Sequence, residues 1–240
     1  GVAGISTGTA APSGHATVTD LMINGLYDFN KGGTIVPYIG LGVGGARIDA
    51  KASNRVNTVG DDVFGETTLT NFQEQGIDIT FVARAPGASG VAPIWVEPDG
   101  TNRIICVPGA NNSMTPAQAK SALETLNGYQ IVIGQLEIPQ AVTLEAFKTA
   151  HKFGAITILN PAPFAPISEE LITECDWIIP NESEFAGMHP QGLEPTSDQV
   201  ILELSATLKT RFAVTLGDKG AAFTTQDGKV HRVSAPKVTA

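Results

Sequence analysis

Four apolar runs in the chain each end in a polar or glycine-rich cluster. The runs cover residues 131–133, 155–159, 177–179 and 212–214. Short apolar runs of this kind are typical of strands buried in a parallel sheet, whose carboxyl ends line the ligand crevice of an open α/β fold. The clusters that follow them, at 134–137, 160–163, 181–184 and 215–220, are therefore expected to share one site.

Helix signals lie between these strands. Thr115 and Gln118 form a capping-box pattern around a proline at the first helical position, which predicts a helix over 116–127. Thr196 and Gln199 similarly predict a helix over 197–209.

A third helical pattern repeats apolar residues from Leu144 to Phe153 and ends at Gly154. Strand, polar turn and helix thus alternate from about Val56 onward, which predicts an α/β fold. One stretch departs from this alternation: residues 90–97 and 102–107 are rich in β-formers and flank a Pro-Asp-Gly-Thr turn. A small antiparallel flap projecting from the sheet is expected there.

The N-terminal segment has a different pattern. Residues 17–49 alternate with period two in two stretches joined by a turn at 30–33. The sequences of residues 26–29 and 37–44 resemble those of bacterial outer-membrane β-barrel proteins. On this resemblance, residues 1–49 would form a β-hairpin of separate character. An ordinary hairpin attached to the sheet explains the same alternation.

Composition narrows the classes of function. The chain has 240 residues, of which 42% are hydrophobic, enough for one domain with a sizeable core. Its net charge of −9 argues against a nucleic-acid partner. Cys106 and Cys175 lie in apolar runs and are expected to be buried, reduced thiols. The chain has no apolar stretch of transmembrane-helix length and no secretory pattern, so we expect a cytoplasmic location, while Gly1 in place of Met indicates a fragment.

A series of motifs occurs in a familiar order and spacing. It comprises Val59-Gly60-Asp61-Asp62-Val63-Phe64-Gly65, the flap ending in Pro108-Gly109-Ala110-Asn111, Gln135-Leu136-Glu137, Asn160-Pro161-Ala162-Pro163, Pro180-Asn181-Glu182-Ser183-Glu184 and Thr215-Leu216-Gly217. Over about residues 52–240 the chain resembles the ribokinase-like (PfkB) family of sugar kinases. The resemblance implies a mostly parallel sheet of eight or nine strands flanked by helices. It also implies a small β-lid that covers the sugar and makes a homodimer contact.

The resemblance also implies roles for residues at the strand ends. Asn181 and Glu184 would organise Mg²⁺ and its waters beside the phosphates. Thr215, Gly217 and Gly220, together with Asn181, would bind ATP. The residues alone leave alternatives open, because Asn181 and Glu184 also fit a helix capping box and 215–220 also fits an ordinary tight turn.

Glu137 matches a family glutamate whose carboxylate accepts hydrogen bonds from sugar hydroxyls, with a solvated loop charge as the alternative. Asn160 is expected to shape its proline turn rather than to bind ligand. The four histidines have no metal-ligand spacing, so no zinc site is expected.

The family's catalytic aspartate lies in a Gly-Ala-Gly-Asp motif that is expected beyond Ala240, so no catalytic residue is assigned. Most of a monovalent-cation (K⁺) site, expected in intact relatives, would lie there too. We therefore expect a composite chain: a barrel-like segment, 1–49, and a ribokinase-like core, 50–240, truncated at both ends.

Two functions follow from these expectations. One is an ATP- and Mg²⁺-dependent kinase of a pentose, with D-ribose at O5 as the expected acceptor. The other is a catalytically incomplete or chimeric fragment without turnover, which would meet a membrane only if 1–49 is a true barrel piece.

Overall fold

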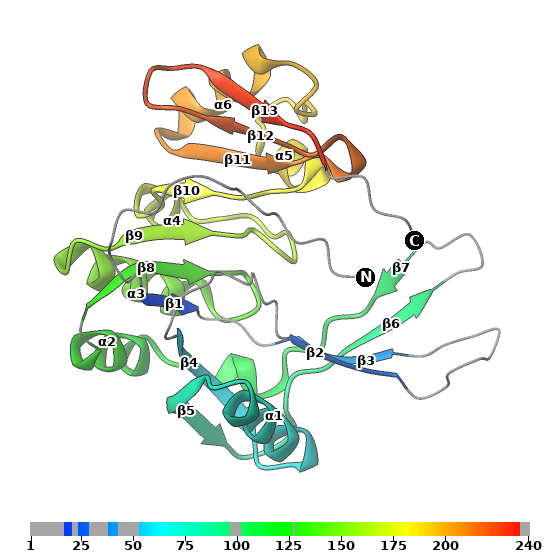
Figure 1. Ribbon diagram of the computed structural model, residues 1–240, viewed down its shortest axis with the longest axis vertical. Coiled ribbons are helices and arrows are strands. Elements are labelled where there is room, and N and C mark those ends of the chain that lie inside the picture. Colours follow the sequence, from blue (N-terminus) through cyan, green and yellow to red (C-terminus); the bar gives the residue numbers. More distant parts are fainter. Residues whose placement is uncertain are drawn as a thin grey trace.

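The structure is a computed structural model that describes residues 17–20, 24–28, 38–42, 53–96, 102–126 and 128–235. Its strands form a nine-stranded sheet and a four-stranded sheet (Figure 1). In spatial order the larger sheet contains β13 (Val230–Val233), β12 (Ala221–Thr224), β11 (Arg211–Thr215), β10 (Trp177–Ile178), β9 (Ile156–Leu159), β8 (Tyr129–Gly134), β1 (Thr17–Asp20), β4 (Ser53–Gly60) and β5 (Asp78–Ala85).

Neighbouring strands from β11 to β5 are all parallel, while the β11–β12 and β12–β13 pairs are antiparallel, so that β12 runs opposite to the other strands. The predicted strands at 131–133, 155–159, 177–179 and 212–214 correspond to β8, β9, β10 and β11. The expected α/β fold with a mostly parallel sheet is therefore confirmed.

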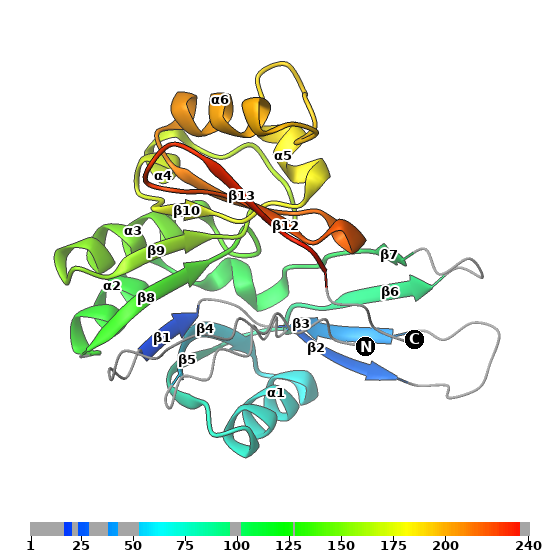
Figure 2. The ribbon, with the colours of Figure 1, turned by 45° about the horizontal axis from the view of Figure 1, so that its top comes forward.

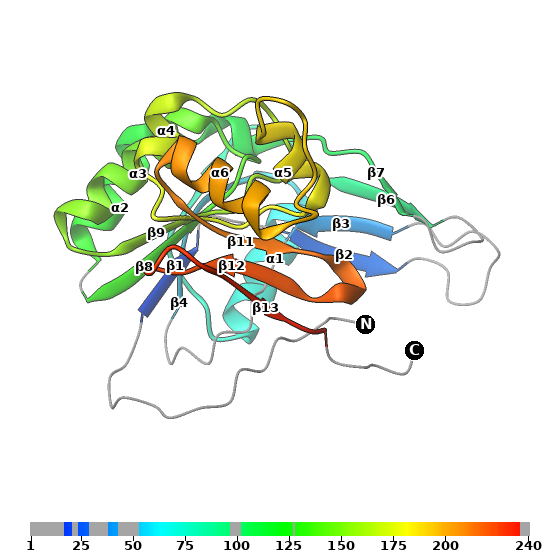
Figure 3. The ribbon, with the colours of Figure 1, turned by 90° about the horizontal axis from the view of Figure 1, so that it is seen from above.

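Helices cover both faces of this sheet, as Figures 2 and 3 show. The described helices are α1 (Val63–Glu74), α2 (Pro116–Thr125), α3 (Gln140–Lys152), α4 (Glu169–Thr173), α5 (Glu182–Met188) and α6 (Asp198–Leu208), with short 3-10 turns η1 (Gly109–Ser113) and η2 (Gly217–Lys219). Helix α1 lies on one face, and α2 to α6 lie on the other. The larger core, under α2 to α6, includes the fully buried Phe147, Phe185 and Phe212. A smaller core of Val59, Leu69 and Phe72 lies under α1.

The helix ends agree with the sequence at two positions and differ at one. Thr115 and Gln118 form the predicted capping box, and Gly154 ends the turn after α3 with φ +73°. The predicted cap Thr196 is wrong: Ser197 caps α6 by accepting a hydrogen bond from the amide of Val200 at 3.4 Å. The amide of Thr196 instead bonds Glu194 O at 2.8 Å, which keeps Thr196 in the preceding turn.

The smaller sheet is antiparallel and contains β2 (Asn24–Asp28), β3 (Tyr38–Gly42), β6 (Ala92–Val96) and β7 (Asn102–Ile104), in that order. We call it the lid. Strands β6 and β7 confirm the predicted flap, while its Pro-Asp-Gly-Thr turn lies outside the described residues. The lid projects from the carboxyl edge of the larger sheet (Figure 1).

The N-terminal strands are part of this architecture. Strands β2 and β3 pair with each other, as the alternation predicts, but β3 also pairs with β6 of the lid. Strand β1 lies between β8 and β4 in the larger sheet. The expectation of a hairpin of separate character is corrected by these pairings, because period two identifies a strand but not the sheet that receives it. The composite origin of residues 1–49 and the division from 50–240 stay predictions.

Within the described part of the chain, no helix has the length and hydropathy needed to cross a membrane.

Candidate functional site

The four predicted clusters all leave the same edge of the larger sheet. Because β8, β9, β10 and β11 are parallel, the residues that follow them lie at one edge (Figure 1). Backbone hydrogen bonds join neighbouring loops there. The amide of Leu136 donates to Ala162 O at 3.1 Å, and the amide of Thr215 donates to Pro180 O at 2.9 Å. The shared edge expected from the sequence is confirmed.

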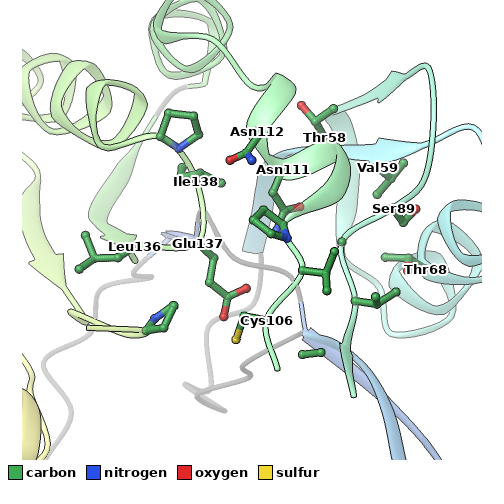
Figure 4. A pocket seen from close by; sticks show the side chains of 17 residues that line it. Thr58, Val59, Thr68, Ser89, Cys106, Asn111, Asn112, Leu136, Glu137 and Ile138 are labelled. Atoms are coloured by element: carbon green, nitrogen blue, oxygen red, sulfur yellow. The ribbon is translucent and has the colours of Figure 1, made fainter. Parts of the chain in front are cut away.

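A cavity of about 140 Å³ lies where the lid meets this edge (Figure 4). Three groups of residues form most of its wall. These are the two chain segments that connect β6 and β7 to the core (89–92 and 106–108), Asn111 and Asn112 of η1, and the loop after β8 (136–139). The cavity therefore lies between the base of the lid and the end of β8.

Glu137 is half-buried in the wall of this cavity. Figure 4 shows its side chain extending toward Cys106, which lies on the lid side of the cavity. Partial desolvation of the Cys106 thiol raises its pKa, and the nearby Glu137 charge raises it further. The site thus places one carboxylate close to a small thiol at the lid.

The prediction that both cysteines are buried holds for Cys175 alone. Cys175 is buried, its thiol donates to Leu171 O at 3.1 Å, and burial raises its pKa. Cys106 is exposed. Its apolar neighbours belong to the base of the lid, where the chain leaves the core, and this explains why an apolar run did not imply burial.

Asn111 is a site residue to which the sequence assigned no role beyond a lid position. It is 8% exposed and lines the cavity from η1. A Cβ atom on Gly90 would lie 2.7 Å from Pro108 O and 3.1 Å from Nδ2 of Asn111. Glycine is therefore required at position 90 for the two lid connections to approach each other beside this amide. The sequence signal that could have identified Asn111 was the Gly109-Ala110-Asn111 motif at the end of the flap.

Asn181 and Glu184 form a capping box at the start of α5. Asn181 is exposed and Glu184 is half-buried. Burial raises the pKa of Glu184, and the hydrogen bond from the Asn181 amide offsets part of this rise. The capping alternative is thus confirmed. Glu184 accepts that bond through Oε2, and no described residue donates to its Oε1.

The donor set at this helix start fits a hard cation. It offers carboxylate and amide oxygens, which Mg²⁺ prefers, and Mg²⁺ usually keeps several waters. Among the residues that the structure describes, no group of three or more His, Cys, Asp or Glu could hold a metal ion. A bound Mg²⁺ would therefore complete its shell with water and phosphate oxygens.

The 215–220 turn lies beside α5. Both the amide and the hydroxyl of Thr215 donate to Pro180 O, at 2.9 and 3.4 Å. Gly217 has φ +57°, and a Cβ there would meet nothing within 4 Å, so the space beside it is open. Gly220 has φ +98°, and a Cβ there would lie 1.9 Å from Val233 O. The turn is therefore fixed on one side and accessible on the other.

The structure thus brings Asn181, Thr215 and Gly217 together, while Glu137 lies at β8, with β9 between β8 and β10. The arrangement thus consists of a cavity beneath the lid and, at the same edge of the sheet beyond β9, the accessible side of the 215–220 turn. A mostly parallel nine-stranded sheet with an antiparallel lid over its carboxyl edge defines a ribokinase-like α/β protein.

Comparison with known proteins agrees with this class. The model of the pfkB family carbohydrate kinases matches residues 44–240, and the chain belongs to this family. It is 34% identical over 204 residues to a ribokinase of Schizosaccharomyces pombe, covering 81% of this chain and 64% of the relative. It is 32% identical over 200 residues to a deoxyribokinase of Salmonella typhi, covering 80% of this chain and 65% of the relative. The chain thus spans just under two thirds of these two relatives.

A solved structure shows the same fold. The ribokinase of Arabidopsis thaliana, complexed with ribose and ATP, superposes with a TM-score of 0.75 at 24% identity. The match covers 92% of this chain and 78% of that one. The similarity at this level of identity concerns the fold, including the sheet and its lid.

Proposed function

We propose that this chain provides the sugar site and much of the nucleotide site of an ATP-dependent kinase that phosphorylates a pentose, with D-ribose at O5 as the acceptor. The observation that carries the proposal is the cavity of about 140 Å³ beneath the lid, with the Glu137 carboxylate in its wall. Its volume suits a small polyol rather than a nucleotide. The names of the two relatives, ribokinase and deoxyribokinase, support a pentose.

Glu137 accepts hydrogen bonds from sugar hydroxyls in this proposal, since a carboxylate is a strong acceptor for a polyol. The side chains of Asn111 and Asn112, which line the cavity from η1, add donors and acceptors (Figure 4). The lid excludes water from the bound sugar, which strengthens these contacts and protects the transferred group.

Asn181, Thr215, Gly217 and Gly220 bind ATP in this proposal, on the accessible side of the 215–220 turn beside α5. Asn181 and Glu184 hold the waters of a Mg²⁺ ion. When bound, Mg²⁺ neutralises charge on the phosphates. The geometry that supports this assignment is the hydrogen bonding of Thr215 to Pro180, which places the turn next to the helix start.

We also propose a cytoplasmic homodimer formed through the lid. The supporting observation is that several large apolar side chains of β6, β7 and the segment after β7 are exposed in the single chain. These are Trp95 (42%), Ile104 (54%), Ile105 (55%) and Val107 (47%). A sheet edge or face of this kind is normally covered by a partner.

Binding and turnover are tested separately, because no catalytic base is assigned in this chain. Calorimetry with D-ribose and 2-deoxy-D-ribose tests the sugar site, and ribose-dependent ADP release tests transfer. The same release is measured with the chain extended by a family segment that carries Gly-Ala-Gly-Asp.

We expect both forms to bind ribose and only the extended form to release ADP. Ribose binding without turnover in either form would favour the remnant function. Absence of pentose binding in both forms would overturn the proposal.

A further inference from the structure

Two chain segments connect strands β6 and β7 of the lid to the core, residues 88–91 before β6 and residues 107–110 after β7. Two backbone hydrogen bonds join them: the amide of Val91 donates to Val107 O at 2.9 Å, and that of Val107 donates to Val91 O at 2.8 Å. Both segments line the cavity. The position of this pair of segments therefore decides the shape of the cavity wall on the lid side.

The carboxylate of Asp62 binds the first of these segments. Its Oδ1 accepts from the hydroxyl of Ser89 at 2.7 Å, and its Oδ2 accepts from the amide of Ser89 at 3.0 Å. The Ser89 hydroxyl oxygen in turn accepts from the amide of Gly60 at 3.0 Å. Ser89 is only 5% exposed, so these bonds are shielded from solvent. One side chain thus joins the end of β4 to the base of the lid.

The second segment is held through the first. The amide of Ala110 donates to Ala88 O at 2.9 Å. A Cβ atom on Gly109 would lie 2.6 Å from both Ala88 O and Ser89 O. This close packing leaves no room for residues 88–89 to shift without moving Gly109. A displacement at Ser89 would therefore reach both segments and the adjacent Asn111.

Asp61 supports the same loop from the other side. Its Oδ1 accepts from the amide of Gly87 at 2.7 Å, and its own amide donates to Gly87 O at 3.1 Å. A Cβ atom on Gly60 would lie 2.4 Å from Gly87 O, so the strand end and the loop are in direct contact. The Gly60-Asp61-Asp62 motif has no role in the proposed sugar and nucleotide sites. It is the point at which the loop before β6 is attached to the core.

The Asp62 carboxylate is well satisfied in its ionised form. Burial works against ionisation, but the hydrogen bonds from Ser89 and from the amide of Gly65 outweigh it and lower the pKa of Asp62. The bond from the Gly65 amide, at 2.8 Å, also caps α1. Asp62 therefore has two separable contacts, one to its own helix and one to the lid.

We propose that Asp62 is a positioning residue that, through Ser89, holds the two segments connecting β6 and β7 to the core in place and thereby sets the affinity of the cavity for its sugar. The inference rests on the proposed function for the identity of the ligand. The attachment itself rests on the contacts above. Asp62 touches no sugar in this account, so its effect is confined to the sugar and leaves ATP binding unchanged.

Two variants separate the lid contact from the helix cap. Asp62→Ser keeps a good N-cap residue but is too short to bind the Ser89 loop. Ser89→Ala removes the hydroxyl bridge and leaves the cap untouched. Ser197→Ala is the matched control, because it removes the cap of α6 at a comparable cost in stability without touching the lid.

The variants are compared by calorimetry with D-ribose and with ATP, and by amide hydrogen exchange at Val91 and Val107. We expect Asp62→Ser and Ser89→Ala to weaken ribose binding roughly 5- to 50-fold. We expect faster exchange at both amides and unchanged ATP binding. Asp62→Asn, which keeps one acceptor oxygen, is expected to lie between them and the wild type.

Three results would overturn the inference. The first is unchanged exchange at Val91 and Val107 in both variants, and the second is an equal change in Ser197→Ala. The third is an unchanged affinity for ribose in variants whose Val91 and Val107 amides exchange faster. If the wild-type chain binds no pentose, the proposed function fails, and the exchange measurement still decides whether Asp62 holds the lid.

Discussion

Asn181 and Glu184 bind each other reciprocally at the start of α5. The amide of Asn181 donates to Oε2 of Glu184, and the amide of Glu184 donates to Oδ1 of Asn181, both at 2.8 Å. The helix cap and the proposed magnesium ligands are therefore the same pair of side chains. This relationship orients both groups before any cation arrives, because each is fixed by a backbone amide.

Glu184→Gln is expected to separate these two roles. Glutamine at this position can still accept the Asn181 amide, so the helix should keep its cap and the free energy of unfolding should change by less than about 0.5 kcal/mol. Loss of the charge should weaken Mg²⁺-dependent ATP binding roughly 10-fold. Calorimetry with ATP, with and without Mg²⁺, measures this. Equal weakening without Mg²⁺ would contradict a metal role.

The same carboxyl group predicts a pH dependence. Burial raises the pKa of Glu184, so protonation begins at a higher pH than for an exposed glutamate. A proton and a cation compete for the carboxylate, and Mg²⁺-dependent nucleotide binding should therefore fall as the pH is lowered through this pKa. Glu184→Gln should remove that dependence. A pH profile that is the same in both proteins would count against the assignment.

Glu137→Gln is expected to weaken ribose binding roughly 10- to 100-fold, because hydrogen bonds to a charged acceptor are worth about 1.5–3 kcal/mol. The matched control is Glu194→Gln, which removes an exposed carboxylate from the loop between α5 and α6. Calorimetry with D-ribose compares the two. An equal loss of affinity in both variants would mean that Glu137 acts only through the net charge of the protein and does not contact the sugar.

Gly220→Ala and Gly217→Ala should differ in stability although both glycines have positive φ. A methyl group at Gly220 would collide with Val233 O, so this change should cost at least about 2 kcal/mol and disturb the pairing of β12 with β13. A methyl group at Gly217 has open space and should cost about 1 kcal/mol. Urea unfolding measures both. An equal loss of unfolding free energy in both variants would mean that the backbone at Val233 moves aside at little cost.

Cys106 reports on the cavity through its reactivity. Partial desolvation and the Glu137 charge both raise the pKa of its thiol. Alkylation by iodoacetamide should therefore reach half its maximal rate at a higher pH than for a free thiol. Glu137→Gln should lower that pH, and D-ribose should slow the reaction. If neither Glu137→Gln nor D-ribose changes the reaction, Cys106 does not lie close to the bound sugar.

The proposed dimer is testable at Ile104, whose side chain is 54% exposed on β7. Ile104→Asp should shift sedimentation from dimer to monomer, since a charge in an apolar interface is costly to bury. Phe164→Asp, at a 41% exposed position outside the lid, is the control. A monomeric wild-type chain at high concentration would contradict the proposal.

Local sequence patterns predicted much of the fold because their physical causes are local. An apolar run followed by a polar cluster identified β8 to β11, and the Thr115–Gln118 pair identified the start of α2. The clusters also identified the site edge, since parallel strands end on one side. Each of these predictions needed only residues within a few positions of one another.

The features that the sequence did not reveal depend on distant partners. The place of β1 is decided by pairing with β4 and β8, and period-two alternation cannot specify those strands. The role of Asp62 depends on Ser89, far along the chain, and the exposure of Cys106 depends on where the lid leaves the core. Tertiary contacts, rather than local preferences, decide all three.

The central place of β1 also has a consequence for the order of folding. Val18 lies opposite Ser53 on one side and Ile131 on the other. A growing chain releases β1 before both of its neighbours, and the second neighbour is absent until β8 has been synthesised. Closing so long a loop is entropically costly and slow compared with local pairing. Although it precedes both neighbours in the chain, β1 is therefore expected to be inserted late, after the strands on both sides of it are in place.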